Sequence, residues 1–143
     1  MWSTVNICKF THYFGRQELI IEMLKGKIHR ATVTEADLNY IGSITLDEDL
    51  MDASGLREFE KVAIFDITNG SRIETYIIRG ERGSGKVCIN GAAAHLVRKG
   101  DLVIIVGYCL LTEDEAKFHE PKIVHVNESN QVTSTCCEES AIA

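Results

Sequence analysis

The sequence contains little proline and no long apolar run. A single proline and eleven glycines among 143 residues exclude a collagen-like or low-complexity chain. The longest apolar run, 102–106, is far shorter than the roughly 20 residues that a membrane-spanning helix needs. Lys9, Arg16 and Glu18 interrupt the N-terminal segment before an apolar signal region can form. The composition therefore predicts no membrane association and no secretory signal.

Positive charge is also scarce. Fifteen Lys and Arg residues stand against 21 Asp and Glu residues, which gives a net charge of -6 and a pI near 5.3. A nucleic-acid-binding domain normally presents a basic face, and no cluster of Lys and Arg here is dense enough to form one. We therefore expect no nucleic acid among the partners.

The cysteines and histidines lack the spacing of a metal site. The five cysteines are odd in number and lie at positions 8, 88, 109, 136 and 137, and the five histidines show no zinc-site pattern. An odd set of cysteines without a secretory signal is typical of a reduced compartment. The sequence therefore predicts a cytoplasmic protein with free thiols and no metal.

The distribution of residue types divides the chain into three parts. We expect a poorly ordered N-terminal extension over 1–22, a single packed domain over 23–126 and a polar C-terminal tail over 127–143. Within the domain, alternation and turn residues predict strands at 24–33, 44–46, 62–68, 72–78, 86–89 and 102–108.

The segments between these strands predict tight turns and short helices. Asn69-Gly70 favours a two-residue hairpin turn, and Gly55 suits the end of a short helix over 47–54. A second helical turn is expected over 92–97, and 34–37 reads as a turn or helical start with Thr34 as the cap. Many short strands with small helices favour a mainly β protein, folded as a compact barrel.

One glycine-rich segment nearly matches a phosphate-binding loop. Gly80 to Lys86 has the glycine and lysine spacing, but Val87 occupies the position of the hydroxyl that binds Mg²⁺. Val-Cys-Ile then predicts a strand where the motif requires a helix. We therefore interpret the segment as a turn between strands and reject nucleotide binding.

Three small groups of polar residues remain. Lys27 and His29 share one face of a strand, and Arg72, Glu74 and Tyr76 share a face of another. A third group places the carbonyl of Gly42 directly before the hydroxyl of Ser43 in 40–43. Taken singly, each group has an ordinary interpretation as edge-strand charges, a solvated strand face or a turn.

Taken together, these segments closely resemble the bacterial pyruvoyl-dependent aspartate 1-decarboxylases. The resemblance covers 23–126 and runs through the segments MLKGKIHR, ADLNYIGS, TNGSR, GERGS and INGAAAH. It implies a double-psi β-barrel assembled as a homotetramer, with active sites shared between neighbouring subunits. The extension over 1–22 departs from the family, in which the Lys-His motif lies close to the start.

The resemblance also implies that the chain is an inert proenzyme that cuts itself between Gly42 and Ser43. Ser43 would attack the Gly42 carbonyl, with Thr75 as the hydrogen-bond donor to the developing oxyanion. Residue 43 would then become a covalent pyruvoyl group at the start of a chain over 43–143. A need for a maturation factor stays open.

In the mature enzyme, the resemblance implies that L-aspartate forms an imine with the pyruvoyl group and loses its α-carboxylate as CO₂. Tyr76 is the implied proton donor that yields β-alanine, the precursor of pantothenate and coenzyme A. The implied substrate-binding residues are Lys27, His29, Arg72, Asn90, Gly91, Ala92, Ala93 and Tyr40.

Two alternatives stay open from the residues alone. Glutamate is longer than aspartate by one methylene, a difference often worth only about 1–3 kcal/mol, so another amino acid could be the substrate. A barrel that never matures and serves only in binding is the non-enzyme alternative. One detail conflicts with the implied site, because strict alternation puts Thr75 on the strand face opposite to Arg72 and Tyr76.

Overall fold

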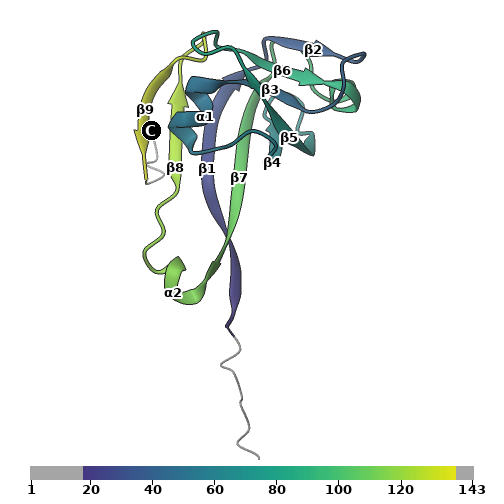
Figure 1. Cartoon of the computed structure of the whole chain (residues 1–143). Helices are drawn as coiled ribbons and strands as arrows, with labels where there is room; N and C mark the ends of the chain where they lie inside the picture. The colour runs from purple at the N-terminus through teal and green to yellow at the C-terminus, as the bar shows by residue number, and fades with distance from the viewer. Residues whose placement is uncertain (1–17, 138–143) are drawn as a thin grey trace, which may run out of the picture.

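A computed structural model describes residues 18–137 (Figure 1). The strands of this part are β1 Ile20–Thr32, β2 Glu35–Asp37, β3 Ile44–Asp47, β4 Lys61–Asp66, β5 Arg72–Gly80, β6 Val87–Asn90, β7 Leu102–Thr112, β8 Lys122–Val126 and β9 Val132–Cys136. The helical elements are α1 Glu48–Ser54, the 3₁₀ turn η1 Gly91–His95 and α2 Glu113–Ala116. The expected mainly β class with short helices is confirmed.

The strands form one sheet that closes on itself. Their order is β2-β6-β3-β5-β4-β7-β1-β8-β9, and β1 leads directly into β2 through Val33 and Thr34. β1 and β2 therefore act as one continuous strand, and the strands from β2 to β1 close into a ring of six positions. Most neighbours in this run are antiparallel, but β2 with β6 and β3 with β5 are parallel. Two parallel pairs in a closed ring of six strand positions are the connectivity expected of a double-psi β-barrel.

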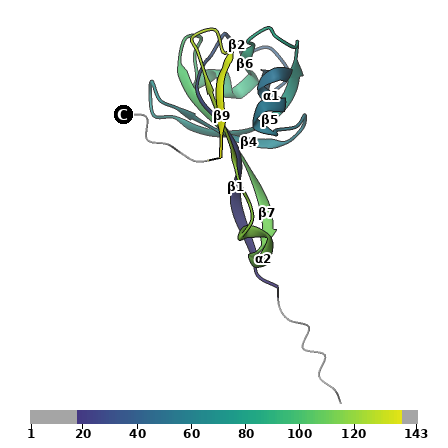
Figure 2. The same cartoon turned by 90° about the vertical axis from the view of Figure 1, so that its left-hand side faces the viewer.

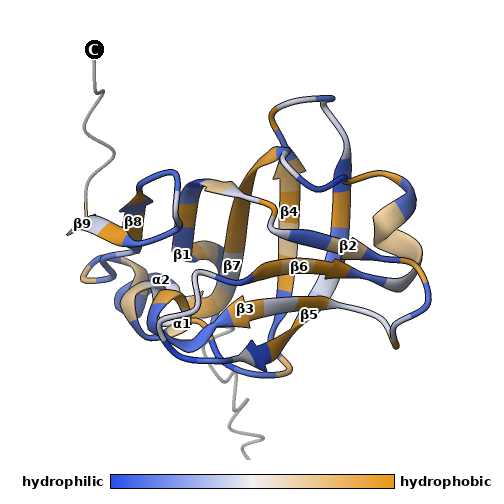
Figure 3. Cartoon of the chain, turned by 90° about the horizontal axis from the view of Figure 1, so that it is seen from above, coloured by the Kyte–Doolittle hydropathy of each residue, from blue (hydrophilic) through white to orange (hydrophobic). Residues whose placement is uncertain are grey.

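Branched aliphatic side chains fill the barrel. Hydrophobic residues dominate the barrel strands in Figure 3, most continuously along β6, and the inward-facing set is almost completely buried. The largest of these fully buried side chains include Ile28, Ile44, Ile64, Ile77, Ile89 and Ile105. Because this core fixes the inner face of each strand, the residues of opposite parity must face outward.

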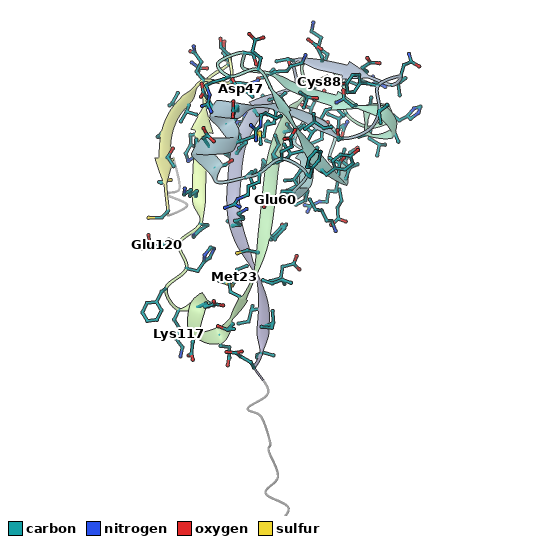
Figure 4. The ribbon with its side chains drawn as sticks, in the orientation of Figure 1. Met23, Asp47, Glu60, Cys88, Lys117 and Glu120 are labelled. Carbon is teal, nitrogen blue, oxygen red and sulfur yellow. The ribbon has the colours of Figure 1, made fainter. Side chains whose placement is uncertain are left out.

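β1 and β7 continue beyond the barrel as a two-stranded ribbon that ends near α2 (Figures 1 and 2). Met23, labelled in Figure 4, pairs with Cys109 on this ribbon. The ribbon carries exposed apolar side chains, among them Ile20 at 53% and Leu110 at 70% exposure. β1 thus begins at Ile20, three residues before the expected domain start, because pairing with β7 extends the strand.

The expected turn or helical start at 34–37 is wrong. Glu35–Asp37 forms β2, which pairs in parallel with Cys88 to Asn90 of β6. The Thr34 hydroxyl donates to the Val87 carbonyl and accepts from the Val87 amide, each at 3.0 Å. The hydroxyl that could cap a helix is therefore used across the sheet, and tertiary pairing outweighs the local preference.

The hairpin between β4 and β5 is confirmed, but its two-residue turn is wrong. Five residues, 67–71, separate the strands. The Asp66 carboxylate accepts from the amides of Thr68 and Asn69, at 2.8 and 3.1 Å, and so organises a wider loop. Gly70 has a φ of +80°, the positive value that the sequence predicts at this position.

The C-terminal segment is more structured than the expected polar tail. β9 pairs antiparallel with β8, although most of its side chains are exposed. Asn130, only 2% exposed, donates through Nδ2 to the carbonyls of Thr32 and Gly85, at 2.8 Å each. Polar composition concealed this strand because it lies at the sheet edge, where few side chains need to be apolar.

The glycine-rich loop between β5 and β6 binds a carboxylate of the protein itself. The buried Asp47 carboxylate accepts from the amides of Gly83 and Gly85, at 3.0 and 2.7 Å. It also caps α1 by accepting from the Asp49 amide, and Gly55 ends the helix in a left-handed conformation as expected. Val87 begins β6, which agrees with the rejection of a phosphate-binding loop.

Candidate active site at the Gly42–Ser43 turn

The turn into β3 has an unusual backbone. Gly42 and Ser43 both have positive φ, at +45° and +86°. Residues other than glycine rarely adopt a positive φ. Such residues cluster at functional sites, because the surrounding structure must hold the backbone in this conformation. Ser43 is 3% exposed, and its hydroxyl donates to the carbonyl oxygen of Gly42. The hydroxyl is thus held beside the carbonyl group that precedes it.

Tyr76 reaches this turn from β5. β3 and β5 pair in parallel with Ile44 beside Ile77, so the preceding residues, Ser43 and Tyr76, are neighbours in register. A Cβ added at Gly42 would lie 3.3 Å from the Tyr76 hydroxyl. Tyr76 is 40% exposed, so its ring forms an open wall of the site.

Asn90 and Gly91 close the other side of the turn. The backbone N–H of Asn90 donates to the Ser43 carbonyl at 2.8 Å and continues the antiparallel pairing of β3 with β6. A Cβ added at Gly91 would lie 3.1 Å from both N and Cα of Gly42 and 3.3 Å from the Tyr40 carbonyl oxygen. Glycine at 91 therefore permits an approach that a side chain would obstruct. Ala92 and Ala93 follow in η1 and keep this wall small.

Thr75 does not share the face of Tyr76. Its neighbours along β5 alternate regularly, since Ile77 is buried while Glu74 and Tyr76 are exposed. The pairings of β5 with β3 and β4 show no register shift. The conflict noted from the sequence thus remains within the single chain, and no irregularity of β5 resolves it.

Arg72 is the first residue of β5, whereas Tyr76 lies at the middle of the strand. Four residue steps along an extended strand separate them by about 13 Å. The Arg72 guanidinium stacks over the Phe65 ring, 4.7 Å from its centroid. Both side chains line a hollow of about 570 Å³ on the outer sheet face, together with Glu22, Lys61, Glu74 and Tyr108. Phe65 was not predicted as a site residue, because the expected two-residue turn would have placed Ile67 opposite Arg72, whereas the structure pairs Phe65 with Arg72.

Lys27 and His29 lie apart from both the Ser43 turn and Arg72. Both belong to β1, which β5, β4 and β7 separate from β3 in the sheet order. His29 pairs in register with His125 of β8, and the two rings meet edge to face with centroids 5.5 Å apart. The structure therefore gathers Gly42, Ser43, Tyr76, Asn90 and Gly91, but it leaves the three predicted cationic residues on other parts of the surface.

Among residues 18–137, no helix is long and apolar enough to cross a membrane. Within the same residues, no group of three or more His, Cys, Asp or Glu side chains is arranged to hold a metal ion.

The fold and the site together define a small β-barrel protein with a glycine–serine turn of positive φ that Tyr76 and Asn90 flank. The family model described as aspartate decarboxylase matches residues 19–133. The chain therefore belongs to the aspartate decarboxylase family.

Curated relatives agree with this assignment, and each is named aspartate 1-decarboxylase. The protein from Caldicellulosiruptor saccharolyticus is 63% identical over 114 residues, which cover 80% of this chain and 89% of the relative. The protein from Neisseria meningitidis is 64% identical, covering 77% and 87% of the two chains. The protein from Acetivibrio thermocellus is 55% identical and covers 85% and 96%. A computationally designed protein, msDPBB_sym2, matches with a TM-score of 0.39 and 20% identity, covering 61% of this chain and 99% of that chain.

Proposed function

We propose that this protein is a cytoplasmic aspartate 1-decarboxylase that matures by cutting itself between Gly42 and Ser43. It would remove the α-carboxylate of L-aspartate to give β-alanine and CO₂, and so supply pantothenate and coenzyme A synthesis. The observation that carries the proposal is the Ser43 hydroxyl held against the Gly42 carbonyl in a turn where both residues have positive φ. Membership of the aspartate decarboxylase family supports the substrate.

The turn suits an internal acyl shift. The Ser43 oxygen attacks the Gly42 carbonyl carbon, the peptide C–N bond breaks and an ester forms in its place. Elimination then releases Gly42 as a carboxylate and leaves dehydroalanine at position 43, and addition of water yields a pyruvoyl group with loss of ammonia. Glycine at 42 offers little hindrance to the attack. Thr75 stays our proposed donor to the oxyanion, on the strength of the family resemblance alone.

The residues around position 43 fit a planar keto group. Asn90 already donates its backbone N–H to the Ser43 carbonyl, which would become the amide carbonyl next to the ketone. Gly91 provides space against the turn, and Ala92 and Ala93 add only methyl groups. Once formed, the pyruvoyl group supplies a ketone for the substrate amine and an adjacent carbonyl that withdraws electrons. The Asn90 N–H would stabilise negative charge on that carbonyl.

Tyr76 and Arg72 have separate tasks in this proposal. The Tyr76 phenol holds the proton that is returned to the substrate Cα. Arg72 binds the carboxylate that stays, because its planar guanidinium matches a carboxylate in two hydrogen bonds. Tight binding of the departing carboxylate would instead stabilise the ground state and slow its loss.

We further propose that the active site forms between neighbouring subunits of a homotetramer. Lys27 and His29 lie on β1, apart from the Ser43 turn of their own chain, so a neighbour's copies would supply them. The exposed apolar side chains of the β1–β7 ribbon, such as Leu110, offer surface for such contacts. Tyr40 would contribute to the wall of the pocket.

Intact-mass spectrometry of the purified protein tests the proposal. We expect a chain of residues 1–42 and a chain of 143 − 42 = 101 residues, the latter with a pyruvoyl terminus. The cut protein should convert L-aspartate to β-alanine, with L-glutamate as the comparison substrate. A chain that stays whole after heating and after incubation with extract of its source cells, the test for a maturation factor, would contradict the proposal.

A further inference from the structure

The side-chain amide of Asn90 is held at both ends. The Cys88 thiol donates to Asn90 Oδ1 at 3.1 Å, and Asn90 Nδ2 donates to the Thr45 hydroxyl at 2.9 Å. Asn90 and Cys88 are only 2% and 4% exposed, so water does not replace these bonds easily. The two hydrogen bonds, one from each end of the amide, together hold the plane of this side chain in place.

The sheet register places this pair directly beside residue 43. Cys88 of β6 lies opposite Thr45 of β3, and the Asn90 backbone N–H bonds to the Ser43 carbonyl. Cys88 and Asn90 are two residues apart on one strand and therefore share a face. Figure 4 labels Cys88 on the barrel, well away from the ribbon that carries Met23.

The thiol is suited to act as a donor. Burial raises the pKa of Cys88, and the Glu35 carboxylate, which lies beside it on β2, raises that pKa further. The thiol therefore keeps its proton near neutral pH. Glu35 is also a competing acceptor for this proton, but Lys86 lies 3.6 Å from its carboxylate and offsets its charge.

We propose that Cys88 and Thr45 are positioning residues that orient the Asn90 amide toward residue 43 and its substrate. This inference rests on the proposed function, because it gives Asn90 a place in the pocket. Asn90 Nδ2 carries two hydrogens, and Thr45 takes one of them. The other is the donor that the fixed amide offers to the pocket.

Paired substitutions of the mature enzyme test this role. Cys88→Ala and Thr45→Val remove the hydrogen bonds at similar volume, while Cys88→Ser and Thr45→Ser keep a hydroxyl in place. We expect Cys88→Ala and Thr45→Val to lower kcat for L-aspartate about tenfold, the size of effect expected for one lost hydrogen bond, and the Ser variants to stay near wild type. In an Asn90→Ala background, Cys88→Ala should cause no further loss, because the group that it positions is gone.

Two outcomes would overturn the inference. Equal losses in Cys88→Ala and Cys88→Ser, or a further loss from Cys88→Ala in the Asn90→Ala background, would mean that Cys88 acts through packing. Crystal structures of wild type and Cys88→Ala give a readout independent of activity, since an unchanged Asn90 amide in the variant also refutes positioning. Wild-type protein that is cut but does not decarboxylate L-aspartate would refute the proposed function, whereas an unaffected Cys88→Ala enzyme would refute only this inference.

Discussion

The Ser43 turn brings its predicted site residues together within one chain, whereas the predicted residues of the outer sheet surface lie apart from one another. At the turn, β3, β5 and β6 bring Ser43, Tyr76 and Asn90 together through regular pairing. On the outer surface, Arg72 lies on β5 and Lys27 on β1, two strands that are not adjacent in the sheet. In our proposal, the bond to be cut is therefore prepared within the chain, while substrate binding depends on assembly.

The largest effect is expected from Ser43→Ala, which removes the hydroxyl from the turn. Because no other group can form the ester, we expect a chain of full length and no detectable β-alanine formation. Intact-mass spectrometry and a β-alanine assay measure both outcomes. Ser129→Ala, in an exposed loop, is the control and should be cut normally. Cleavage of Ser43→Ala at the same bond would rule out the role of the hydroxyl.

Tyr76→Phe should separate cleavage from turnover. The variant keeps the ring that packs beside Gly42 but loses the proton donor, so we expect cleavage with kcat lowered by about 10²–10⁴-fold. Steady-state kinetics on the cut protein measure the loss. Normal turnover by Tyr76→Phe would remove this tyrosine as the acid.

A complementation experiment tests whether two chains share one site. Lys27→Ala should be cut but should lose about 10²-fold in kcat/KM, because a charge-assisted contact to the substrate is gone. Coexpression of Lys27→Ala with Ser43→Ala should then restore part of the activity. One chain would contribute the processed residue 43 and the other Lys27. Absence of any recovery in a verified mixed oligomer would place both residues in the same chain's site.

Gly91→Ala tests how closely the turn must be packed. Alanine at a positive φ costs about 1–2 kcal/mol, and here its Cβ would also come within 3.1 Å of Gly42. Gly70→Ala is a matched control, since Gly70 also has positive φ but a Cβ there would meet nothing within 4 Å. Thermal unfolding should show a loss of stability in both variants, and time-resolved mass spectrometry should show slower cleavage only in Gly91→Ala. Equal cleavage rates would mean that close packing is not required.

The smallest effect is expected at the hairpin, away from the turn. Burial, together with the neighbouring Asp101, raises the pKa of the Asp66 carboxyl above its ordinary value. A raised pKa means that Asp66 contributes most to stability when protonated, and that this contribution is lost as pH rises through the folded-state pKa. Asp66→Asn keeps the acceptor for the amides of Thr68 and Asn69 but removes the charge.

We therefore expect Asp66→Asn to unfold at a higher temperature than wild type at pH 7, with the difference shrinking toward pH 3. Cleavage at Ser43 should be unchanged. Thermal melts over this pH range measure the effect, and a variant less stable than wild type at pH 7 would contradict it.

Much of the fold was predictable because local patterns and tertiary structure agree. The strand alternation, the helix over 47–54 and the positive φ at Gly70 follow from residue type and spacing. The two-residue turn was wrong for a local reason, because the Asp66 carboxylate organises a wider loop. Thr34 and β9 instead depend on partners distant in sequence, such as Val87 for the Thr34 hydroxyl. A local pattern carries no information about such partners.

The candidate site divides in the same way. The sequence by itself determined the family and the glycine–serine pair, because ordered motifs at matching separations identify both. Only the tertiary structure decided that Tyr76 and Asn90 flank Ser43, that Phe65 supports Arg72 and that Lys27 lies on a separate strand. The physical reason is that side chains meet through strand register and barrel closure, which are set by the packing of the whole core.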